Sequence, residues 1–448
     1  MPYISNTDRD RRKIMDTIGV KDFSELIACI PPKMVMNKPL ALDEPLSELE
    51  ITNRIKAKTC QNICAGSANS FLGAGVYDHF IPAAVDTIVS RPEFYTAYTP
   101  YQAEVSQGTL QYIYEYQTMI CELTGMGIAN ASMYDGASAV AEAILMAVRK
   151  NKLMKAILPA TLHPDYVKVI KSYTSGIGVE LLTAPAKDGI TDLSALEAMM
   201  DDTIGSVTVQ QPNFYGNLED AAAIDAIAHK FPKCLLIACV DPISLAIINP
   251  PSEYHADIVV GEGQALGNSM YMGGPLFGFF ATKLEMARLM PGRIVGGTLD
   301  VEGKKAYALT LQAREQHIRR SKATSNICSN QSLCILAATV YMSLMGREGL
   351  KEVATQSAQK AHYAAMELCK LPGFALAYPH APFFKEFVLS TPLPAAKIIK
   401  AMLPRNIYPG LDMAPFGMPN ALMIAITEKK LKADIDALVK AMKEVNHE

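Results

Sequence analysis

The sequence predicts an α/β protein with a mainly parallel sheet, and three observations support this fold class. Six short apolar runs lie between residues 155 and 282, and patterns with helical periodicity separate most of them. Strands that alternate with helices are typical of parallel sheets joined by right-handed crossovers. Beyond residue 330 the chain returns to a mixture of helices and apolar runs. We therefore expect a large α/β domain followed by a smaller C-terminal one.

The chain begins with a helical arm, predicted over residues 1–65. Ser47 and Glu50 have the spacing of a capping box, so a helix is expected to start at Ser47. An irregular stretch rich in Gly, Pro and Tyr follows over residues 66–103. The next helices are predicted at 106–123 and between the turn at 130–138 and residue 150.

The large domain is predicted over residues 66–325. Its strands are expected at 155–160, 179–184, 206–211, 234–240, 257–260 and 276–282. No helix separates the last two runs, so one edge of the sheet is expected to be antiparallel. After residue 285 the sequence turns polar, which predicts helices up to the domain boundary.

The small domain is predicted over residues 326–448. It is expected to begin with a helix pair, of which residues 333–346 are apolar enough to be buried. Strands are predicted at 374–379, 383–391 and 421–427, and further helices at 395–403 and at the C-terminus.

The composition argues against several classes of protein. The 448 residues carry a net charge of -3, which provides no basic surface for nucleic acid. No apolar run reaches the roughly 18 residues that span a bilayer, and the N-terminus lacks the apolar core of a secretory signal. We expect a cytoplasmic protein that binds neither nucleic acid nor membranes. Charged residues make up only 19 % of the chain, against about 25 % on average, which indicates a large core and a large subunit interface.

The cysteines do not suggest a metal centre. There are nine of them, at irregular spacings and without a CxxC pair. Cys60 and Cys64 are four residues apart, but no histidines or second pair accompany them. Reduced cysteines and no metal site are therefore predicted.

Open α/β sheets bind ligands beyond the carboxyl ends of their strands, and the turn Tyr134–Ser138 is expected there. Its small residues and hydroxyl group open a helix. Such a helix N-terminus can bind a phosphate through backbone N–H groups. An ordinary N-cap made by Asp135 or Ser138 explains the same residues.

Asp241 is expected at the same edge, at the end of the apolar run 234–240. In pyridoxal-phosphate (PLP) enzymes of this architecture, such an Asp pairs with the pyridinium nitrogen of the cofactor. Alternatively, Asp241 and Pro242 only begin a turn.

The glycine-rich loop 261–280 follows the next strand, where PLP enzymes carry the lysine that bonds the cofactor. No lysine or arginine occurs between Lys233 and Lys283. Gln264 cannot replace a primary amine in this chemistry. The sequence therefore predicts the scaffold of a PLP enzyme without its covalent anchor.

The segment Arg314–Asn326 concentrates cations together with hydroxyl and amide donors. A solvated helix followed by an N-cap at Thr324 or Ser325 explains this pattern. The same donors could bind a phosphate across a subunit interface.

Four stretches carry a resemblance to a known family. They are SFLGAGVYDHFIPAAV at 70–85, FYTAYTPYQAEVSQGTLQ at 94–111, NASMYDGASAVAEA at 130–143 and REQHIRRSKATSNIC at 314–328. They resemble the glycine dehydrogenase (decarboxylating) family, the P-protein of the glycine cleavage system, and more narrowly its subunit 1, the alpha chain of the two-subunit form. The resemblance implies the PLP-dependent transferase fold of type I, with a mainly parallel seven-stranded sheet.

The resemblance also implies a function that needs a partner. In this family the beta chain carries the PLP lysine and the alpha chain lacks it, so the loop 261–280 would be a vestigial active site. The implied reaction decarboxylates glycine and transfers the aminomethyl group to the lipoyl arm of H-protein, with release of CO2. The implied partners are glycine dehydrogenase subunit 2 (the beta chain) in an alpha2beta2 heterotetramer, lipoylated H-protein and glycine. This chain would complete the active site at the subunit interface and be inactive alone.

The residues expected to reach that shared site come from two segments. The catalytic set is Tyr95, Tyr98, Gln102, Arg314 and His317, and the cofactor-binding set is Thr324, Ser325 and Asn326. The tyrosines, including Tyr101, are expected to line the glycine pocket or the lipoyl passage, unless they form a tyrosine-rich subunit interface. Arg314, His317 and Arg320 either bind the carboxylate of glycine or orient the turn at 324–326 from behind.

Two other functions stay open. The first is a self-sufficient PLP enzyme resembling cysteine desulfurases or aminotransferases, which the absence of lysine between 234 and 282 disfavours. The second is a catalytically inert homodimeric scaffold or regulator that keeps the fold.

Overall fold

The computed structural model of the protein describes residues 5–36, 38, 40–271 and 273–446. The chain divides into two compact units, Met1–Ile63 and Cys64–Glu448. Each unit is described by itself below.

The first unit consists of helices without a core. Its α-helices are α1 (Asp8–Ile18), α2 (Phe23–Leu26) and α3 (Glu48–Thr59). The predicted capping box is confirmed, because Ser47 and Glu50 exchange hydrogen bonds with each other's backbone N–H groups at the start of α3. None of the described residues up to 63 is buried, and Phe23 and Leu42 are among the exposed apolar side chains. A segment with this pattern gains stability only by covering its apolar side chains on another surface.

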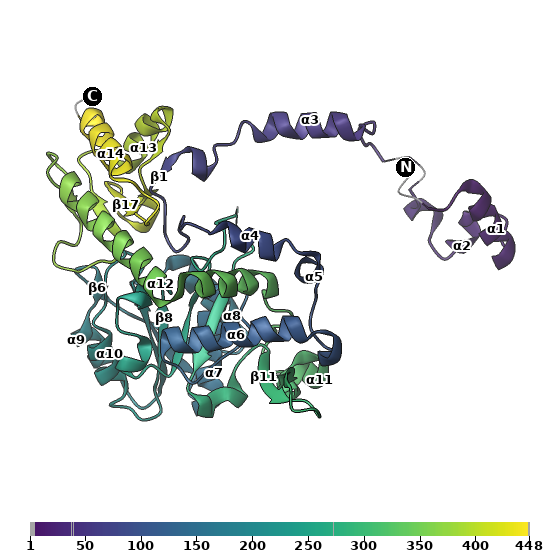
Figure 1. The fold of residues 1–448 in the computed structure, drawn as a ribbon, viewed down its shortest axis with the longest axis horizontal. Coiled ribbons are helices and arrows are strands. Elements are labelled where there is room, and N and C mark those ends of the chain that lie inside the picture. Colours follow the sequence, from purple (N-terminus) through teal and green to yellow (C-terminus); the bar gives the residue numbers. More distant parts are fainter. Residues whose placement is uncertain (1–4, 37, 39, 272, 447–448) are drawn as a thin grey trace. The chain divides into compact units, whose positions relative to one another are not determined.

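A seven-stranded sheet forms the centre of the second unit (Figure 1). In spatial order the strands are β2 (Ile128–Ala129), β10 (Gly278–Thr282), β9 (Ile258–Glu262), β8 (Leu235–Val240), β7 (Ile204–Gln211), β3 (Lys155–Pro159) and β4 (Glu180–Ala184). The five strands from β9 to β4 pair in parallel, whereas β10 is antiparallel to both of its neighbours. The mainly parallel sheet and its antiparallel end are confirmed.

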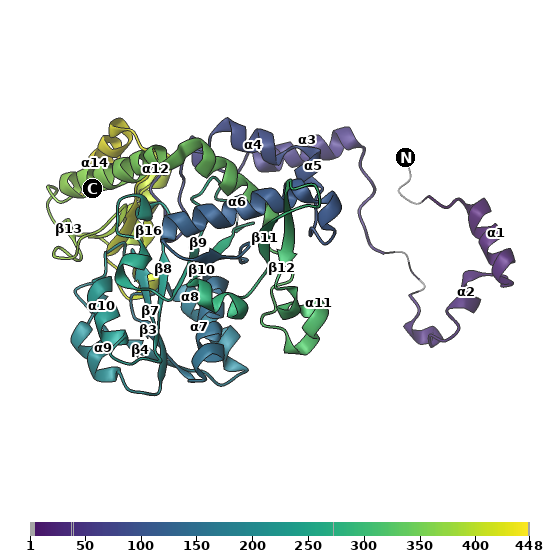
Figure 2. The same ribbon diagram turned by 60° about the horizontal axis from the view of Figure 1, so that its bottom comes forward.

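Helices cover both faces of this sheet. One face packs on α6 (Gln107–Thr124), α9 (Leu193–Met199), α10 (Ala221–Ala228) and the first part of α12 (Ser332–Leu368), and the other on α7 (Gly136–Asn151) and α8 (Pro164–Ser175). Along β8, Leu236 and Ala238 face the first group, and Leu235 and Ile237 face the second. This strand is buried on both faces, which explains its continuous apolar sequence. Figure 2 shows α6 and α12 side by side on one face.

The apolar stretch predicted as a buried helix is the first part of α12. The backbone leaves the helical conformation at Gly346 (φ 56°, ψ -169°), so two helical segments meet there, as expected for a helix pair. By length and composition α12 could cross a membrane, but 50 % of its apolar stretch is buried inside the protein. The packing of α12 on α6 identifies it as a core helix.

The prediction of helices after residue 285 was wrong in part. An antiparallel hairpin of β11 (Ile294–Leu299) and β12 (Lys305–Thr310) occupies this region, and the short helix α11 (Gln316–Arg319) follows, with a 3-10 turn on either side. Only Ile294 and Val295 at the base of the hairpin are buried. The rest is exposed or only half-buried, so its sequence lacks the strongly apolar run that marks a buried strand.

A four-stranded antiparallel sheet forms the centre of the C-terminal region. Its strands, in spatial order, are β13 (Ala375–Leu376), β14 (Glu386–Ser390), β17 (Ala421–Ala425) and β16 (Leu411–Asp412), and it packs on α13 (Ala395–Met402), α14 (Lys432–Val445) and the end of α12. The short strand β1 (Asn69–Ser70) pairs in parallel with β15 (Ile407–Tyr408). The segment before α4 (Ala83–Val89) and α5 (Pro92–Tyr95) therefore belongs in space with the C-terminal region.

An ion-pair cluster fixes the amino ends of β8 and β9. Asp257 accepts hydrogen bonds from the backbone N–H of Leu236 (2.9 Å) and from Lys283 Nζ (2.5 Å), and it contacts His229 Nε2 (3.0 Å). The other ring nitrogen of His229 contacts Asp225. The hydrogen bond to Asp257 raises the pKa of His229, and Asp225 adds to this effect against the effect of burial.

This cluster predicts a pH-dependent part of the stability. A histidine with a raised pKa in the folded state stabilises the fold fully below its unfolded pKa of about 6.5, and this contribution disappears as the pH rises through the folded value. The difference in melting temperature between the wild type and His229→Gln should therefore be largest below pH 6.5 and shrink at higher pH. The surface variant His380→Gln is the control and should follow the wild type. A difference that does not change with pH would contradict this assignment.

Candidate functional site

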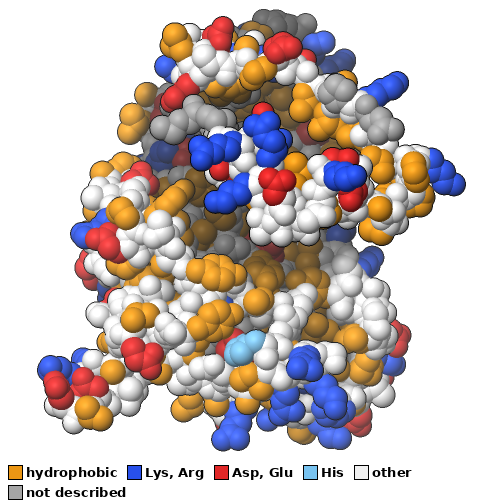
Figure 3. All heavy atoms as spheres, turned by 90° about the vertical axis from the view of Figure 1, so that its right-hand side faces the viewer, with side chains coloured by type: hydrophobic (Ala, Val, Ile, Leu, Met, Phe, Trp, Pro, Cys, Tyr) orange, Lys and Arg blue, Asp and Glu red, His pale blue; other side chains and the backbone are white. Residues whose placement is uncertain are grey.

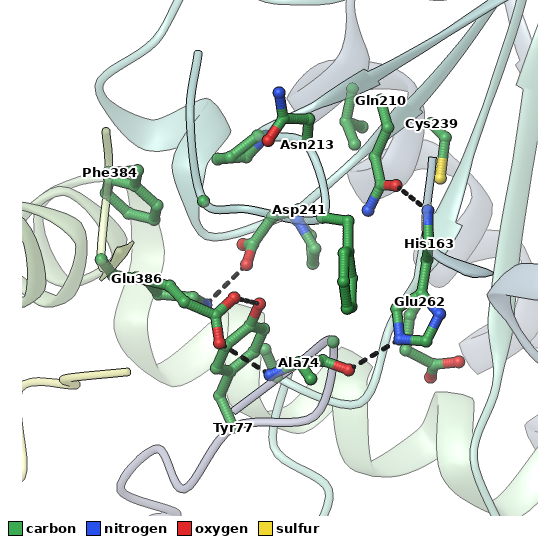
Figure 4. Close-up of a pocket in the computed structure, with 18 of the residues that line it drawn as sticks. Ala74, Tyr77, His163, Gln210, Asn213, Cys239, Asp241, Glu262, Phe384 and Glu386 are labelled. Atoms are coloured by element: carbon green, nitrogen blue, oxygen red, sulfur yellow. Dashed lines mark hydrogen bonds and ion pairs between the residues drawn. The ribbon is translucent and has the colours of Figure 1, made fainter. Parts of the chain in front are cut away.

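A small cavity lies beyond the carboxyl ends of the parallel strands, where the sequence predicted a ligand site (Figure 4). The large domain contributes Asp241, His163 and Glu262, and the start of β14 contributes Lys385 and Glu386. The space left between the side chains is about 50 Å³. Small-molecule sites usually offer roughly 300–1,000 Å³, so protein groups already fill most of this site.

An ion pair between Asp241 and Lys385 lies at the centre of the cavity. Lys385 Nζ is 2.6 Å from Asp241 Oδ2, and the two side chains are 2 % and 14 % exposed. The other carboxylate oxygen of Asp241 accepts hydrogen bonds from the backbone N–H groups of Ile243 and Ser244. Burial raises the pKa of Asp241, but Lys385 outweighs this effect and holds the pKa below its usual value. Asp241 thus begins a turn and also bears a buried negative charge.

Lys385 has two further partners. Its ammonium group lies 3.1 Å from His79 Nε2 and 3.8 Å from the ring centre of Tyr77. Burial and the charge of Lys385 lower the pKa of His79, so its imidazole is neutral and Nε2 accepts the hydrogen bond. His79 Nδ1 then donates to Glu428 Oε2 at 2.6 Å. All three donor directions of the ammonium group are therefore directed at an acceptor or a π face.

Glu386 connects the same strand to the irregular segment around Tyr77. Its carboxylate accepts hydrogen bonds from the backbone N–H of Ala74 (2.7 Å) and from the hydroxyl group of Tyr77 (2.9 Å). Burial raises the pKa of Glu386 to about 7. The amide of Gln264 completes the arrangement, because it accepts from the backbone N–H of Tyr77 and donates to its carbonyl group. The lysine-free loop thus holds the aromatic segment in place.

Glu262 lies at the N-terminus of α7. Glu262 Oε2 accepts a hydrogen bond from the backbone N–H of Gly136 at 2.9 Å, and Oε1 accepts from Gln264 and Phe277. Burial raises the pKa of Glu262 to about 8. Asp135 is the N-cap of α7 and forms a capping box with Ser138. The ordinary N-cap considered for residues 134–138 is therefore present.

These residues do not fit PLP in this chain. Among the described residues that line the cavity, Lys385 is the only lysine, and Asp241 binds its amine. The first N–H group of α7, which a phosphate would need, already donates to Glu262. Among the described residues, those around Asp241 leave too little free space for a group the size of the cofactor.

Two of the predicted residues, Tyr101 and His317, lie around the buried Arg293. The sequence analysis did not identify Arg293 itself. Arg293 contacts Glu315 (3.2 Å), Thr99 Oγ1 (3.3 Å) and Tyr101 OH (3.2 Å), and its side chain is only 3 % exposed. His317 packs edge-on against Tyr101 with 5.8 Å between the ring centres. The structure thereby brings together the two segments that the sequence predicted for the shared site.

The other predicted aromatic residues lie on the same exposed segment. Tyr98 contacts Ser329 through their hydroxyl groups at 2.8 Å, while Tyr95 ends α5 and Gln102 follows Tyr101. The side chains of Tyr95, Tyr98 and Tyr101 are 68 %, 74 % and 52 % exposed. All three residues are therefore largely exposed in the part of the chain that the structure describes.

Arg314 does not point its guanidinium group outward. It donates to the backbone carbonyl groups of Leu311 (3.1 Å), Gly292 (3.0 Å) and Met290. Its own carbonyl group accepts from the N–H of Thr324. These contacts favour the interpretation in which Arg314 orients the turn at 324–326 from behind.

The turn at 324–326 borders an open pocket. Thr324, Ser325, Asn326 and Arg320 line it. The hydroxyl group of Ser325 donates to the buried Glu142 at 2.7 Å. Arg319, Arg320 and Lys322 are exposed. Figure 3 views the side of the molecule that carries α11 in Figure 1. It shows Lys and Arg side chains gathered beside a histidine.

Comparison with known proteins places the chain in a family. The family model described as "Glycine cleavage system P-protein" matches residues 1–442. The chain belongs to the P-protein family. It is 51 % identical to a chain of Chlorobium limicola and 50 % identical to one of Carboxydothermus hydrogenoformans, over 444 residues and 99 % of every chain involved. Both relatives are named "Probable glycine dehydrogenase (decarboxylating) subunit 1".

Solved structures support the same assignment. A crystal structure of glycine decarboxylase (P-protein) of the glycine cleavage system, in inhibitor-bound form, matches with a TM-score of 0.91 and 42 % identity over 99 % of this chain and 100 % of the other. The glutamate decarboxylase of Lactobacillus brevis matches with a TM-score of 0.68 at 11 % identity, over 93 % of this chain and 96 % of the other. At that identity the similarity concerns the fold alone. The PLP-dependent transferase fold of type I is confirmed for this member of the P-protein family.

The buried contact between Arg293 and Glu315 makes a testable prediction. Arg293→Met should lower the free energy of unfolding by about 3 kcal/mol, because it leaves Glu315 buried without its cation. The double variant Arg293→Met/Glu315→Gln should lose clearly less. Urea denaturation measures the stabilities, and limited proteolysis should show faster cleavage between residues 95 and 105 in the single variant. Equal losses in both variants would show that the two side chains are not coupled.

Proposed function

We propose that this member of the P-protein family is the alpha subunit of glycine decarboxylase and that its beta subunit binds PLP. Full-length similarity to subunit 1 chains supports the subunit assignment. The observation that carries the proposal is the cavity at Asp241, where protein side chains take the place that a cofactor would need. A chain with this fold and a filled cofactor site can contribute to catalysis only together with a partner.

The proposed reaction is the decarboxylation of glycine coupled to reduction of a disulfide. The bond between the α-carbon and the carboxyl carbon of glycine breaks and CO2 leaves. A bond forms between the α-carbon and one sulfur of the lipoyl disulfide on H-protein, and the other sulfur becomes a thiol. The glycine carbon is oxidised and the disulfide is reduced, so the electrons balance. PLP, when bound by the partner, supplies an electron sink for the breaking bond.

This chain would contribute an exposed face to the shared site. Tyr98, Tyr101 and His317 lie on that face, and Arg293 holds Tyr101 from behind. Phenol and imidazole groups can donate hydrogen bonds to a carboxylate. We therefore propose that these side chains orient glycine or line the lipoyl passage and exclude water, with Tyr95 and Gln102 further along the same segment. An alpha2beta2 assembly in the cytoplasm, with H-protein as the acceptor, completes the proposal.

The turn at 324–326 would contact the cofactor phosphate of the partner. Thr324 and Asn326 border the open pocket, and exposed arginines and a lysine stand beside them. Charge-assisted hydrogen bonds from such donors suit a phosphate. Ser325 would support the turn, because its hydroxyl group already donates to Glu142.

Co-expression with the candidate beta chain tests the function. Exchange of labelled bicarbonate into glycine is expected only when both chains and lipoylated H-protein are present. Borohydride reduction of the complex should then leave a pyridoxyl group on the beta chain and none on this one. A pyridoxyl adduct on peptides of this chain would overturn the proposal, and absence of exchange in a well-formed complex would favour an inert scaffold.

A substitution at Thr324 tests the turn. Thr324→Ala should weaken PLP binding by the complex roughly tenfold, because a hydrogen bond to a charged group contributes about 1.5 kcal/mol. Thr203→Ala, which removes an exposed hydroxyl group outside this pocket, is the matched control and should leave PLP affinity unchanged. Titration of the cofactor-free complex with PLP, followed by absorbance, gives both affinities. Unchanged affinity in Thr324→Ala would remove the turn from the cofactor site.

A further inference from the structure

We propose that Lys385 and Glu262 occupy the positions that the ring nitrogen and the phosphate of PLP would need, and that they determine which subunit is loaded with cofactor. Each group lies at a position that a PLP enzyme of this fold would use for the cofactor. Each is held there by contacts within the chain. The inference rests on the proposed function, because it gives a physical reason why the cofactor belongs to the partner.

Lys385 takes the role of the positively charged ring nitrogen. Asp241 stands at the carboxyl end of β8, and an acid in that place pairs with a pyridinium nitrogen in PLP enzymes. Here Asp241 pairs with Lys385 Nζ at 2.6 Å. Because His79 and the ring of Tyr77 surround the remaining sides of the ammonium group, it does not need a further ligand. A pyridinium ring could reach Asp241 only by displacing a buried cation.

Glu262 takes the role of the phosphate. Its carboxyl group accepts the hydrogen bond of Gly136 N–H, the first N–H of α7, and two further backbone hydrogen bonds from the lysine-free loop. The helix end is also tightly closed. A Cβ atom at Gly136 would lie 2.3 Å from Tyr166 Oη and 2.9 Å from Glu262 N. An added phosphate would meet the acid groups of Glu262 and Asp135 instead of free donors.

The region between these two groups is filled as well. The ring of Tyr77 lies against Lys385, and His163 stacks on Tyr166 with 5.0 Å between ring centres. Gln264, on the loop where a PLP enzyme carries its lysine, holds the backbone of Tyr77 from both sides. The same loop that lacks the covalent anchor therefore fixes an aromatic side chain in the cavity. Charge, hydrogen bonding and volume all act against the cofactor at this one site.

A binding experiment on the isolated full-length chain tests the proposal. Pyridoxamine 5′-phosphate is the probe, because it has the ring and the phosphate of PLP but needs no lysine. Calorimetric titration should show no saturable binding to the wild type and saturable binding to Lys385→Ala/Glu262→Ala. Lys430→Ala, which removes a partly buried lysine outside the cavity, is the control and should behave like the wild type.

Two results would overturn the proposal. One is equal binding of the probe by the wild type and the double variant. The other is a double variant that folds, as judged by circular dichroism, and still binds nothing. Neither result concerns bicarbonate exchange by the wild-type complex, so failure of this inference and failure of the proposed function are distinguishable.

A stability measurement keeps the proposal testable if the double variant does not fold. Asp241→Asn and Lys385→Met should each lower the melting temperature, because each leaves one buried charge without its partner. Asp241→Asn/Lys385→Met should regain part of that loss. Losses that simply add would show that Lys385 does not serve as the counter-ion of Asp241, and the proposal would fall.

Discussion

The structure around the cavity depends on one buried contact, the ion pair between Asp241 and Lys385. Asp241 directly follows the central strand β8 of the large sheet, and Lys385 directly precedes β14 of the small sheet. Two charges removed from water need good geometry and further hydrogen bonds to be tolerated. His79, the ring of Tyr77 and the turn after Asp241 supply these contacts. The pair therefore joins the two sheets and obliges the segment around Tyr77 to close over them.

The lysine-free loop 261–280 takes part in the same arrangement. A loop at the carboxyl ends of parallel strands exposes backbone groups that must find partners when they are buried. Here Glu262 accepts hydrogen bonds from the backbone N–H groups of Gln264 and Phe277, and the amide of Gln264 donates to the carbonyl group of Asn268. Neither side chain can form the covalent bond that a PLP enzyme needs, but both stabilise a closed conformation. The loop thus combines the absence of a lysine with hydrogen bonds made by its own side chains.

The sequence predicted those helices and strands whose signals come from residues that are neighbours in the chain. Apolar runs revealed β3, β7, β8, β9 and β10, and the capping box at Ser47 revealed the start of α3. The pairing of Asp241 with Lys385 was not predictable in this way, because 144 positions separate the two residues. One signal was present: Lys385 and Glu386 interrupt an apolar run predicted as a strand. A charge in a buried strand requires a partner, and Asp241 was a candidate for that role.

The charges around Tyr101 are arranged differently from those in the cavity at Asp241. There the charges of Arg293 and Glu315 are buried behind the surface, and Arg314 gives its donors to backbone carbonyl groups. The groups left facing outward are tyrosines and His317, with the cations of residues 319–322 nearby. The phenol groups of Tyr98 and Tyr101 can donate hydrogen bonds to a partner's ligand without first breaking an ion pair of their own. The charges at Asp241 are therefore paired within the chain, whereas the face around Tyr101 leaves its aromatic side chains exposed.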